Sequence, residues 1–368
     1  MRVGFDARWY NDSGVGSYVA ELVKAMAPLQ QDFELIVYEN PCNPVPGLDE
    51  LPIERIPLSS PKYSFLEQWE LPRRCREDKL DIFHSPFYVV PLVAPCPVVV
   101  TVHDLIPFLF RIYTWPKQQM IRMGYRLAVR QSTRIIADSH RTAQDLQDLL
   151  KVSPAKITVI SMGVSQSDFH ANRNEGELDD LRRRYDITVP YVMAASARNW
   201  RTKNLKSALQ TLILSRRETE VPFQTVVYGP GKGLEALQPG NDWRELNLRR
   251  LGYVPARDLG ALFRYALLFL MPSLYEGFGL PALEAMSCGC PVVTSNAGSL
   301  AEVAGSGAQT FAPNDVEGMA GAVAQLLHHP EDVKKWRNRA LQRARDFSWE
   351  RAAEETISVY HRALQGNR

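Results

Sequence analysis

The stretch LLFLMPSLYEGFGLPALEAMSCG, residues 267–289, contains an apolar segment, a glycine-rich loop and a short segment with helical end signals, in that order. The apolar segment Leu267–Met271 predicts a buried strand. Pro281 suits the first turn of a helix and Gly289 suits the residue after its last turn, so we expect a helix between them. A strand that enters a helix through a glycine-rich loop is typical of a parallel α/β sheet.

The loop in this stretch has the composition of an anion-binding site. Gly277 and Gly279 let the backbone approach a ligand, and the amides at the helix entrance, together with the helix dipole, favour a phosphate. Two carboxylates flank the loop, Glu276 within it and Glu284 on the helix. A carboxylate can accept two hydrogen bonds from a vicinal diol, so the pair could hold two sugars on either side of a diphosphate. Either glutamate alone fits a solvated surface residue better than a binding residue.

The same alternation of apolar strands and helices extends over the whole chain. It predicts an α/β protein with two Rossmann-like, doubly wound domains that face a cleft, with ligands at the carboxyl ends of the strands. The predicted strands are Arg2–Asp6, Phe33–Tyr38, Ile82–Ser85, Val98–His103, Arg134–Ala137 and Ile157–Ile160 in the first half, and Tyr191–Ser196, Thr225–Tyr228, Leu248–Gly252, Leu267–Met271, Pro291–Thr294 and Gln309–Phe311 in the second.

A polar stretch between the two series of strands indicates where the domains meet. We expect an N-terminal domain over residues 1–164, a linker region with a surface helix over 165–187, and a C-terminal domain over 188–348. The last segment, about 349–368, has apolar residues at helical spacing and lies beyond the second sheet. We expect this helix to pack back on the N-terminal domain. A length of 368 residues suits two domains.

Composition restricts the classes of protein that fit the chain. A hydrophobic content of 45% and a formal net charge of +2 indicate a globular protein and give no general reason to expect nucleic-acid binding. The 5 cysteines are scattered, which favours a reducing compartment over a disulfide framework. The chain starts with a strand pattern instead of a signal peptide, and no apolar run approaches the ~20 residues of a membrane span. A cytoplasmic enzyme is therefore expected.

The quoted stretch and the residues after it resemble the signature of the family 4 retaining glycosyltransferases of GT-B fold. The resemblance covers nearly the whole chain, and it is strongest in the C-terminal half. The matching positions include Glu276, Glu284, the run Ala285–Val293, and Gly298–Val303 with Gly305. The resemblance implies that Glu284 binds the nucleotide ribose and that Glu276, a catalytic residue, contacts the hydroxyls of the transferred sugar. The implied donor-binding residues of this stretch are Gly277, Phe278, Gly279, Leu280 and Glu284.

A departing diphosphate needs positive charge from a metal ion or from Arg and Lys side chains. The chain has no Asp-x-Asp pair, the usual metal–diphosphate ligand of other glycosyltransferases, so we expect no metal and no other cofactor. Cations follow the strand Tyr191–Ser196 instead. The resemblance implies a catalytic Lys and Arg here: Lys203 matches, and the arginine is either Arg198, taken as catalytic, or Arg201, taken as donor-binding. Gly229 is a further donor-binding candidate.

The N-terminal half offers a histidine and a second glycine loop. A lone histidine at a strand end is more often structural, but the resemblance implies that His103 is catalytic and lies within reach of the donor sugar. The loop with Gly14 and Gly16 could suggest dinucleotide binding, but it starts several residues after the first strand, and Val19 occupies the third glycine position. By resemblance, Gly14 and Gly16 lie near the diphosphate and the acceptor.

Within the family, the N-terminal half most resembles bacterial mannosyltransferases of polysaccharide and lipopolysaccharide synthesis, through Phe5–Arg8, Gly14–Gly16 and Val102–Pro107. GDP-mannose is the expected donor and a glycan or lipid-linked sugar the expected acceptor, with a UDP-hexose donor as the alternative. A nucleotide-sugar epimerase, a glycogen-type phosphorylase, an NAD-dependent oxidoreductase and a non-catalytic nucleotide-sugar-binding protein fit less well. No sequence context marks a pyridoxal lysine, and a non-catalytic protein should have lost Glu276 or Lys203.

One segment suggests a further partner. Residues 105–137 contain no acidic side chain, and their arginines at 122, 126 and 130 recur at helical spacing. Aromatic side chains and a methionine interleave with these cations. A basic, aromatic-rich surface suits anionic lipid headgroups, so peripheral association with the inner face of the plasma membrane is one prediction. A solvated helix face is the other. The cations and the interleaved side chains are Arg111, Lys117, Arg122, Arg126, Arg130 and Arg134, with Phe108, Phe110, Tyr113, Trp115, Met120 and Tyr125.

Overall fold

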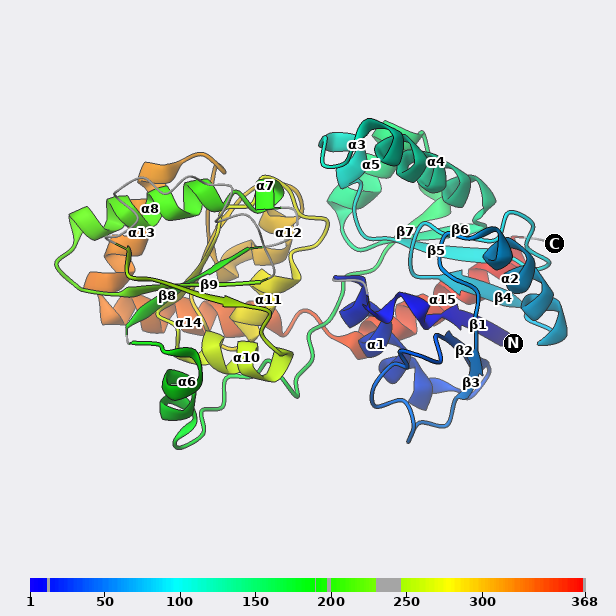
Figure 1. The fold of residues 1–368 in the computed structure, drawn as a ribbon, viewed down its shortest axis with the longest axis horizontal. Coiled ribbons are helices and arrows are strands. Elements are labelled where there is room, and N and C mark those ends of the chain that lie inside the picture. Colours follow the sequence, from blue (N-terminus) through cyan, green and yellow to red (C-terminus); the bar gives the residue numbers. More distant parts are fainter. Residues whose placement is uncertain (12–13, 189, 197–199, 230–245, 367–368) are drawn as a thin grey trace. The chain divides into compact units, whose positions relative to one another are not determined.

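The computed structural model describes residues 1–11, 14–188, 190–196, 200–229 and 246–366. The chain divides into two compact units, Met1–Gly163 together with Ser348–Arg368, and Val164–Phe347. Each unit has its own parallel sheet and its own helices (Figure 1). Arg198, one of the predicted catalytic residues, lies outside the described residues.

The first unit is built on a 7-stranded parallel sheet of order β3-β2-β1-β4-β5-β6-β7. All five residues of the central strand β5 are buried, with Val98, Val100 and Val102 in one core and Val99 and Thr101 on the other face. A strand covered on both faces has no solvent side, which explains its continuous apolar sequence. The strands are β1 (Arg2–Asp6), β2 (Glu34–Glu39), β3 (Glu54–Pro57), β4 (Ile82–Ser85), β5 (Val98–Val102), β6 (Arg134–Ala137) and β7 (Ile157–Val159).

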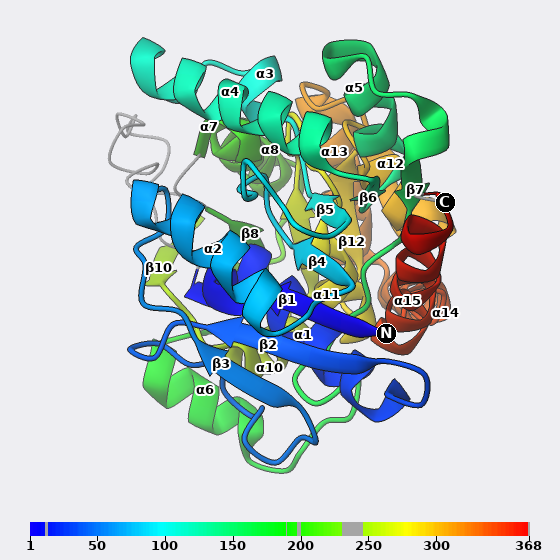
Figure 2. The ribbon, with the colours of Figure 1, turned by 90° about the vertical axis from the view of Figure 1, so that its right-hand side faces the viewer.

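Helices cover both faces of this sheet. Leu71 of α2, Tyr125 of α4 and Leu146 of α5 belong to the core that contains Val98 and Val100. On the other face α1 packs against α15, the final helix of the chain, which also contacts β4, β5 and β6 (Figure 2). The helices are α1 (Val15–Met26), α2 (Phe65–Glu77), α3 (Ile106–Leu109), α4 (Trp115–Gln131), α5 (His140–Leu150) and α15 (Trp349–Gln365), and a 3-10 helix spans Ala7–Asn11.

The second unit has a 6-stranded parallel sheet of order β10-β9-β8-β11-β12-β13. Its strands are β8 (Tyr191–Ala195), β9 (Gln224–Tyr228), β10 (Leu248–Gly252), β11 (Leu268–Met271), β12 (Val292–Ser295) and β13 (Gln309–Phe311). Its described helices are α6 (Glu177–Tyr185), α7 (Trp200–Lys203), α8 (Leu205–Glu218), α10 (Ala256–Tyr265), α11 (Leu280–Ser287), α12 (Leu300–Ala304), α13 (Val316–His328) and α14 (Pro330–Ala344). Helices α8 and α13 pack together and share one core with the sheet.

Residues 165–187, expected as a linker region, belong to the second unit. They contain α6, whose Glu177 accepts hydrogen bonds from Nε and Nη2 of Arg264 in α10 at 3.2 and 2.8 Å. The Arg264 side chain is only 2% exposed, so this ion pair holds α6 against the unit. The polar residues that suggested a linker include the exposed Asn172 and Asn174, which precede α6, and exposed charged side chains of α6 itself, such as Asp179 and Arg183.

In each sheet all strands are parallel, but near the middle the chain switches from adding strands toward one edge to adding them toward the other. This reversal of strand order lies between β1 and β4 in the first sheet and between β8 and β11 in the second. In open α/β sheets, ligands bind at the carboxyl ends of the strands at such a point. The prediction of two doubly wound α/β domains is confirmed by these strand orders. No helix within the described ranges combines the length and the apolar composition that a membrane crossing requires.

Candidate active site

The carboxyl ends of β8 and β11 lie side by side where the second sheet reverses. The segments that follow these strands are joined by hydrogen bonds. Leu274 N donates to the carbonyl of Thr202 at 2.7 Å, and Asn204 Nδ2 donates to the carbonyls of Pro272 at 3.0 Å and Pro313 at 2.9 Å. Segments that are far apart in sequence are thereby fixed to one another at the expected ligand position.

An ion pair crosses this junction. Nζ of Lys203, at the end of α7, lies 2.8 Å from Oε1 of Glu276 in the loop after β11. The two side chains are 16% and 13% exposed, so both charges are largely withdrawn from water, where their interaction is stronger than on an open surface. The structure thus brings two residues that were predicted as catalytic into contact. Arg201 lies two residues earlier in α7 and is exposed.

The predicted donor-binding residues Gly277, Phe278, Gly279 and Leu280 form the connection from β11 into α11. Phe278 is buried, and its ring meets the ring of Phe347 edge to face with centroids 5.8 Å apart. This contact anchors the loop to the unit's interior. Gly279 has a φ of 105° and directly precedes α11. Pro281 has no N–H, and the N–H groups of Ala282 and Leu283 donate to the carbonyl of Gly279 at 3.0 and 3.3 Å, so this end of the helix offers its dipole and the N–H of Leu280.

The same loop is braced from behind by the segment after β12. Ser299 Oγ reaches the carbonyl oxygens of Glu276 at 3.0 Å and Phe278 at 2.6 Å. The preceding Gly298 has a φ of 62°, and a Cβ atom there would lie 2.5 Å from the carbonyl oxygen of Glu276. No side chain fits at this distance, so a glycine is required for the loop to keep its position. The bracing explains why the downstream Gly298–Val303 sequence accompanies the glycine loop.

Glu284 is half-buried in α11. Within the part of the chain that the structure describes, no side chain forms a hydrogen bond or an ion pair with its carboxylate. Burial raises the pKa of Glu284 to about 7, while Lys203 acts to lower it and Asp168 acts to raise it further. A buried carboxylate with few compensating contacts gains stability from any hydroxyl donor that reaches it.

His103 lies in the first unit, directly after β5. Its Nδ1 is 2.6 Å from Oδ2 of Asp138, and its Nε2 is 2.8 Å from the carbonyl oxygen of Pro86. The side chain is 13% exposed, whereas that of Asp138 is fully buried. Burial acts to lower the pKa of His103, but Asp138, together with Pro86 and Asp104, raises it above its ordinary value.

The remaining predicted glycines lie at strand and helix ends. Gly14 directly precedes α1, and Gly16 lies in its first turn, where a Cβ atom would be 2.0 Å from the carbonyl oxygen of Tyr10. Both belong to the first unit, like His103. Gly229 follows β9 in the second unit, and its N donates to the carbonyl of Gly252 at 2.6 Å. Lys203, Glu276, Glu284 and the glycine loop are thus assembled in one unit, around one strand junction.

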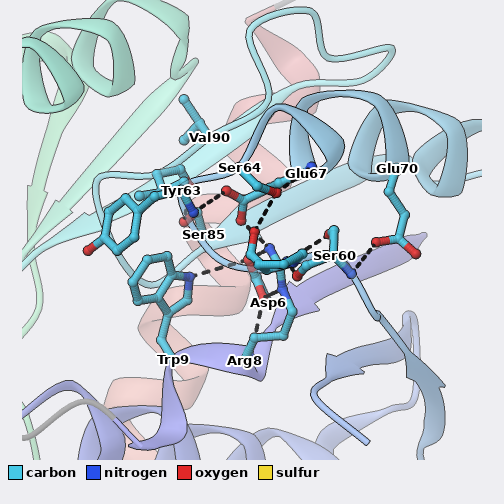
Figure 3. A network of polar contacts seen from close by, with 12 residues as sticks. Asp6, Arg8, Trp9, Ser60, Tyr63, Ser64, Glu67, Glu70, Ser85 and Val90 are labelled. Carbon is cyan, nitrogen blue, oxygen red and sulfur yellow. Dashed lines mark hydrogen bonds and ion pairs between the residues drawn. The ribbon is translucent and has the colours of Figure 1, made fainter.

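A buried polar network occupies the carboxyl end of β1 (Figure 3). Arg8 donates from Nε and Nη2 to the two oxygens of Asp6 at 2.8 Å each, and Nη2 also donates to Oε1 of Glu67 in α2 at 2.6 Å. These three side chains are at most 2% exposed. The Nη1 atom of Arg8 donates to Ser60 at 3.3 Å. The network ties the start of α2 to the end of β1. Its charged side chains pair with one another, which indicates a structural role.

Sequence reasoning did not single out several residues that shape these sites. Asp138 stands directly after β6, as His103 stands after β5, and that parallel placement was the available signal. No signal in the sequence pointed to Asp168 or Glu67, because their neighbours come from distant parts of the chain. In the ranges that the structure describes, no three His, Cys, Asp or Glu side chains are grouped closely enough to hold a metal ion.

Comparison with known proteins identifies the class of enzyme that this fold and site define. The sequence model described as Glycosyl transferases group 1 matches residues 179–343, and that described as Glycosyltransferase Family 4 matches residues 13–168. The chain is 30% identical, over 95% of its length and 96% of the relative's, to O-antigen chain mannosyltransferase B of Escherichia coli. The chain belongs to the family 4 glycosyltransferases of GT-B fold.

Two further proteins are similar to this chain, one in sequence and one in fold. MMP alpha-(1->4)-mannosyltransferase of Mycolicibacterium hassiacum is 29% identical over 68% of this chain and 60% of its own length. The sucrose-phosphate synthase of Thermosynechococcus elongatus superposes with a TM-score of 0.76, covers 100% of both chains and is 17% identical. The first is a relative in sequence, and the second shows the shared fold.

Proposed function

We propose that this glycosyltransferase transfers mannose from GDP-mannose to a glycan or lipid-linked acceptor, with retention of the anomeric configuration. The observation that carries the proposal is the Lys203–Glu276 ion pair at the strand junction of the second unit, with Glu284 on the adjoining helix. The choice of mannose is supported by the name of the E. coli relative, which matches almost the whole chain. A UDP-hexose donor is the alternative.

Each residue of the junction has a role that its chemistry supports. The carboxylate of Glu284 accepts two hydrogen bonds from the ribose diol, because it has acceptor capacity that the described protein groups leave unused. The carboxylate of Glu276 accepts hydrogen bonds from the transferred sugar. Lys203 and an arginine, Arg201 or Arg198, neutralise the diphosphate, and the helix dipole at the start of α11 adds to this.

The same geometry couples donor binding to the ion pair. A diphosphate that approaches Lys203 competes with Glu276 for the ammonium group, since both are anionic oxygen acceptors. Lys203 then turns toward the diphosphate, and Glu276 becomes available for sugar hydroxyls. As the bond from the sugar to the diphosphate breaks, the fixed cation stabilises the growing negative charge. The departing phosphate oxygen takes the proton of the acceptor hydroxyl, which attacks from the same face of the sugar.

Transfer by this route needs no divalent metal ion, because Lys203 and an arginine supply the charge that Mg²⁺ would otherwise supply. The test is the transfer rate in excess EDTA. We expect the rate to stay within about twofold of the untreated enzyme, the range of ordinary assay variation when no charge has been lost from the site. Complete loss in EDTA with recovery in Mg²⁺ or Mn²⁺ would overturn the metal-free proposal.

The donor is tested with a panel of GDP-mannose, GDP, UDP-glucose and UDP-galactose, with mannobiose as a soluble acceptor. We expect mannosyl transfer from GDP-mannose only, and a product with the same anomeric configuration as the donor, read by proton NMR. Transfer from a UDP-hexose alone would establish the alternative donor. A sugar product with the inverted anomeric configuration, whether it is released by transfer or by hydrolysis, would contradict the retaining mechanism.

We also propose that the enzyme works peripherally at the cytoplasmic face of a membrane, through the surface of α4. Its buried side is formed by Gln118, Ile121, Tyr125 and Ala128. The opposite side exposes Trp115, Met120 and Met123, at 64%, 60% and 53%, beside the exposed cations Lys117, Arg126 and Arg130. Exposed apolar side chains with flanking cations suit an anionic lipid surface. Arg122 instead points inward, since its Nε donates to the carbonyl of Pro107 at 2.8 Å.

Flotation with vesicles tests this surface. The wild-type enzyme should float with anionic vesicles and be released by salt, because Debye screening weakens attraction between the cations and the headgroups. Replacement of Met120 and Met123 by Ser should reduce flotation. Replacement of the exposed Leu149 in α5 by Ser serves as the control, because it is an apolar residue outside this surface. Failure of the wild-type enzyme to float would remove the membrane proposal and leave the transferase proposal intact.

A further inference from the structure

The ends of three neighbouring strands meet at His103. Strands β5 and β6 pair with Val102 opposite Ala137, so His103 and Asp138 are the first residues beyond this pairing. Strand β4 pairs with the other side of β5 and ends at Ser85, directly before Pro86. The imidazole therefore bridges its two neighbours, with Nδ1 toward Asp138 and Nε2 toward Pro86, at 2.6 and 2.8 Å.

These two contacts determine which ring nitrogens carry hydrogen. A carbonyl oxygen only accepts hydrogen bonds, so Nε2 must carry the hydrogen that it shares with Pro86. A carboxyl group is ordinarily a stronger acid than an imidazolium, so the hydrogen between Nδ1 and Asp138 resides on the ring. Asp138 lies two residues before the first residue of α5, near the positive end of the helix dipole, which favours the carboxylate form. Burial raises the pKa of Asp138, and His103 acts to lower it. Neither nitrogen of His103 then has a lone pair to offer.

The surroundings of the ring maintain this arrangement. Tyr18 of α1 meets the imidazole edge to face with centroids 4.8 Å apart, and Thr142 of α5 donates to the backbone carbonyl of His103 at 3.2 Å. The other titratable groups that face the ring are Asp104, which favours its positive charge, and His84 on β4. Burial, together with the charge of His103, lowers the pKa of His84 to about 3, so His84 stays neutral.

We propose that Asp138 is a positioning residue that keeps His103 protonated on both ring nitrogens, so that His103 acts in the transferase reaction as a fixed hydrogen-bond donor and not as a general base. The group that His103 serves is therefore an oxygen acceptor, such as a sugar hydroxyl, which can share the Nε2 hydrogen with Pro86. The catalytic part of this inference rests on the proposed function. The protonation state does not, and it is measured separately.

Nitrogen-15 NMR of the imidazole rings tests the protonation state, with His103→Gln used to assign the signals. At pH 7.5 we expect both nitrogens of His103 to be protonated in the wild type. In Asp138→Asn, one nitrogen should lose its hydrogen at a lower pH than in the wild type, because burial then lowers the pKa of His103 without the opposing carboxylate. Asp148→Asn is the control, because it removes an exposed carboxylate from the same helix, α5. An unprotonated ring nitrogen in the wild type at pH 7.5 would overturn the proposal.

The pH dependence of kcat tests the role of His103. A donor is lost when its proton leaves, so activity should fall on the alkaline side, and Asp138→Asn should move this fall about one pH unit or more toward acid. His103→Gln keeps an N–H donor and should retain more activity than His103→Ala, without that alkaline fall.

An acid-side loss with equal inactivation of both His103 variants would identify a base instead. An unchanged profile in Asp138→Asn would overturn the catalytic part even if the NMR result holds, and absence of transfer in every enzyme would count only against the proposed function.

Discussion

At the scale of single residues, we propose that the ammonium group of Lys203 stabilises the charge that the departing diphosphate gains. Removing one such partner from a largely enclosed site should cost about 2–4 kcal/mol of transition-state stabilisation. Lys203→Ala should therefore lower kcat by about two to three orders of magnitude. Steady-state kinetics with GDP-mannose, with thermal unfolding to check the fold, provide the measurement.

Lys206→Ala is the matched control for this variant. Lys206 lies three residues further along the chain, in α8, and its side chain is exposed. Its removal takes away the same charge without touching the Glu276 carboxylate, so the rate should remain near that of the wild type. Equal losses in the two variants would show that the effect comes from the general charge of the surface and not from the ion pair.

If Glu284 binds the ribose as proposed, its carboxyl group makes nucleoside binding dependent on pH. Its pKa in the folded protein is raised from 4.5 to about 7 by burial, so the group is protonated below that pH and ionised above it. Only the ionised form accepts two hydrogen bonds from the ribose diol. Guanosine carries no phosphate that titrates in this range, and its affinity should fall about three- to tenfold between pH 8 and pH 6, within the range of a hydrogen bond to a charged group.

Glu284→Gln provides the control for the titration. An amide keeps one acceptor oxygen but has no proton to gain, so guanosine affinity in this variant should be weak and independent of pH. Calorimetric titration at several pH values distinguishes the two proteins. The assignment of Glu284 to the ribose fails if wild-type and variant affinities show the same pH dependence.

At the scale of elements, a buried chain of hydrogen bonds attaches the final helix to the first sheet. Tyr360 of α15 lies 2.6 Å from Nδ1 of His84, whose Nε2 is 2.8 Å from Oγ1 of Thr101. Tyr18 Oη is in turn 2.8 Å from the same Thr101 oxygen. Because these groups are buried, an unpaired member costs about 1–3 kcal/mol. Tyr360→Phe should lower the free energy of unfolding by that amount, as measured by urea denaturation at pH 7.

The neutral His84 also makes the first unit sensitive to acid. Burial lowers its pKa in the folded protein from 6.5 to about 3, so below pH 6.5 the unfolded chain takes up a proton that the folded state excludes. The contribution of His84 to stability is therefore present above pH 6.5 and is lost progressively as the pH falls toward 3. His84→Gln should flatten this decline, whereas His361→Gln, which removes an exposed histidine from α15, should not. Parallel declines in all three proteins would exclude His84 as the cause.

The elements themselves were largely predictable because buried strands have a continuous apolar sequence. Strands β1, β4, β6, β10 and β13 were predicted with their observed bounds, and most others within one residue. Strand β3 was missed. Its sequence, ERIP, has two charged residues and a proline, and it lies at the edge of the sheet, where only one neighbour and one core residue specify it. The edge strands β10 and β13 were predicted, so β3 was missed because of its charged and proline-containing sequence and not because of its edge position alone.

At the scale of the whole molecule, the two units share one arrangement of strands but have different residues where the strand order switches. Each reverses its strand order near the middle of a parallel sheet. The reversal in the second unit carries Lys203 and Glu276, at 16% and 13% exposure, whereas the reversal in the first carries the fully enclosed network of Arg8. Equivalent positions in the two folds thus carry the proposed ligand site in one unit and an internal network in the other.

The candidate site was predictable from the sequence only in part. Lys203, Glu276 and Glu284 stand in local patterns, at strand ends and on a helix after a glycine loop, and these patterns can be recognised in a single stretch. Asp138 and Ser299 act through residues in other segments of the chain. Their roles depend on strand register and on close backbone approach, which local composition does not encode.

The central claim is that the nucleotide binds in the second unit, at the junction that contains Glu284. Calorimetric titration of GDP into the wild type, Glu284→Ala and His103→Gln tests it most directly, because it needs neither an acceptor nor turnover. We predict that Glu284→Ala weakens GDP binding by about tenfold or more, the loss expected for hydrogen bonds to a charged group. His103→Gln should bind GDP within about twofold of the wild type, because its ring serves the sugar and not the nucleotide. Full GDP affinity in Glu284→Ala would contradict the account.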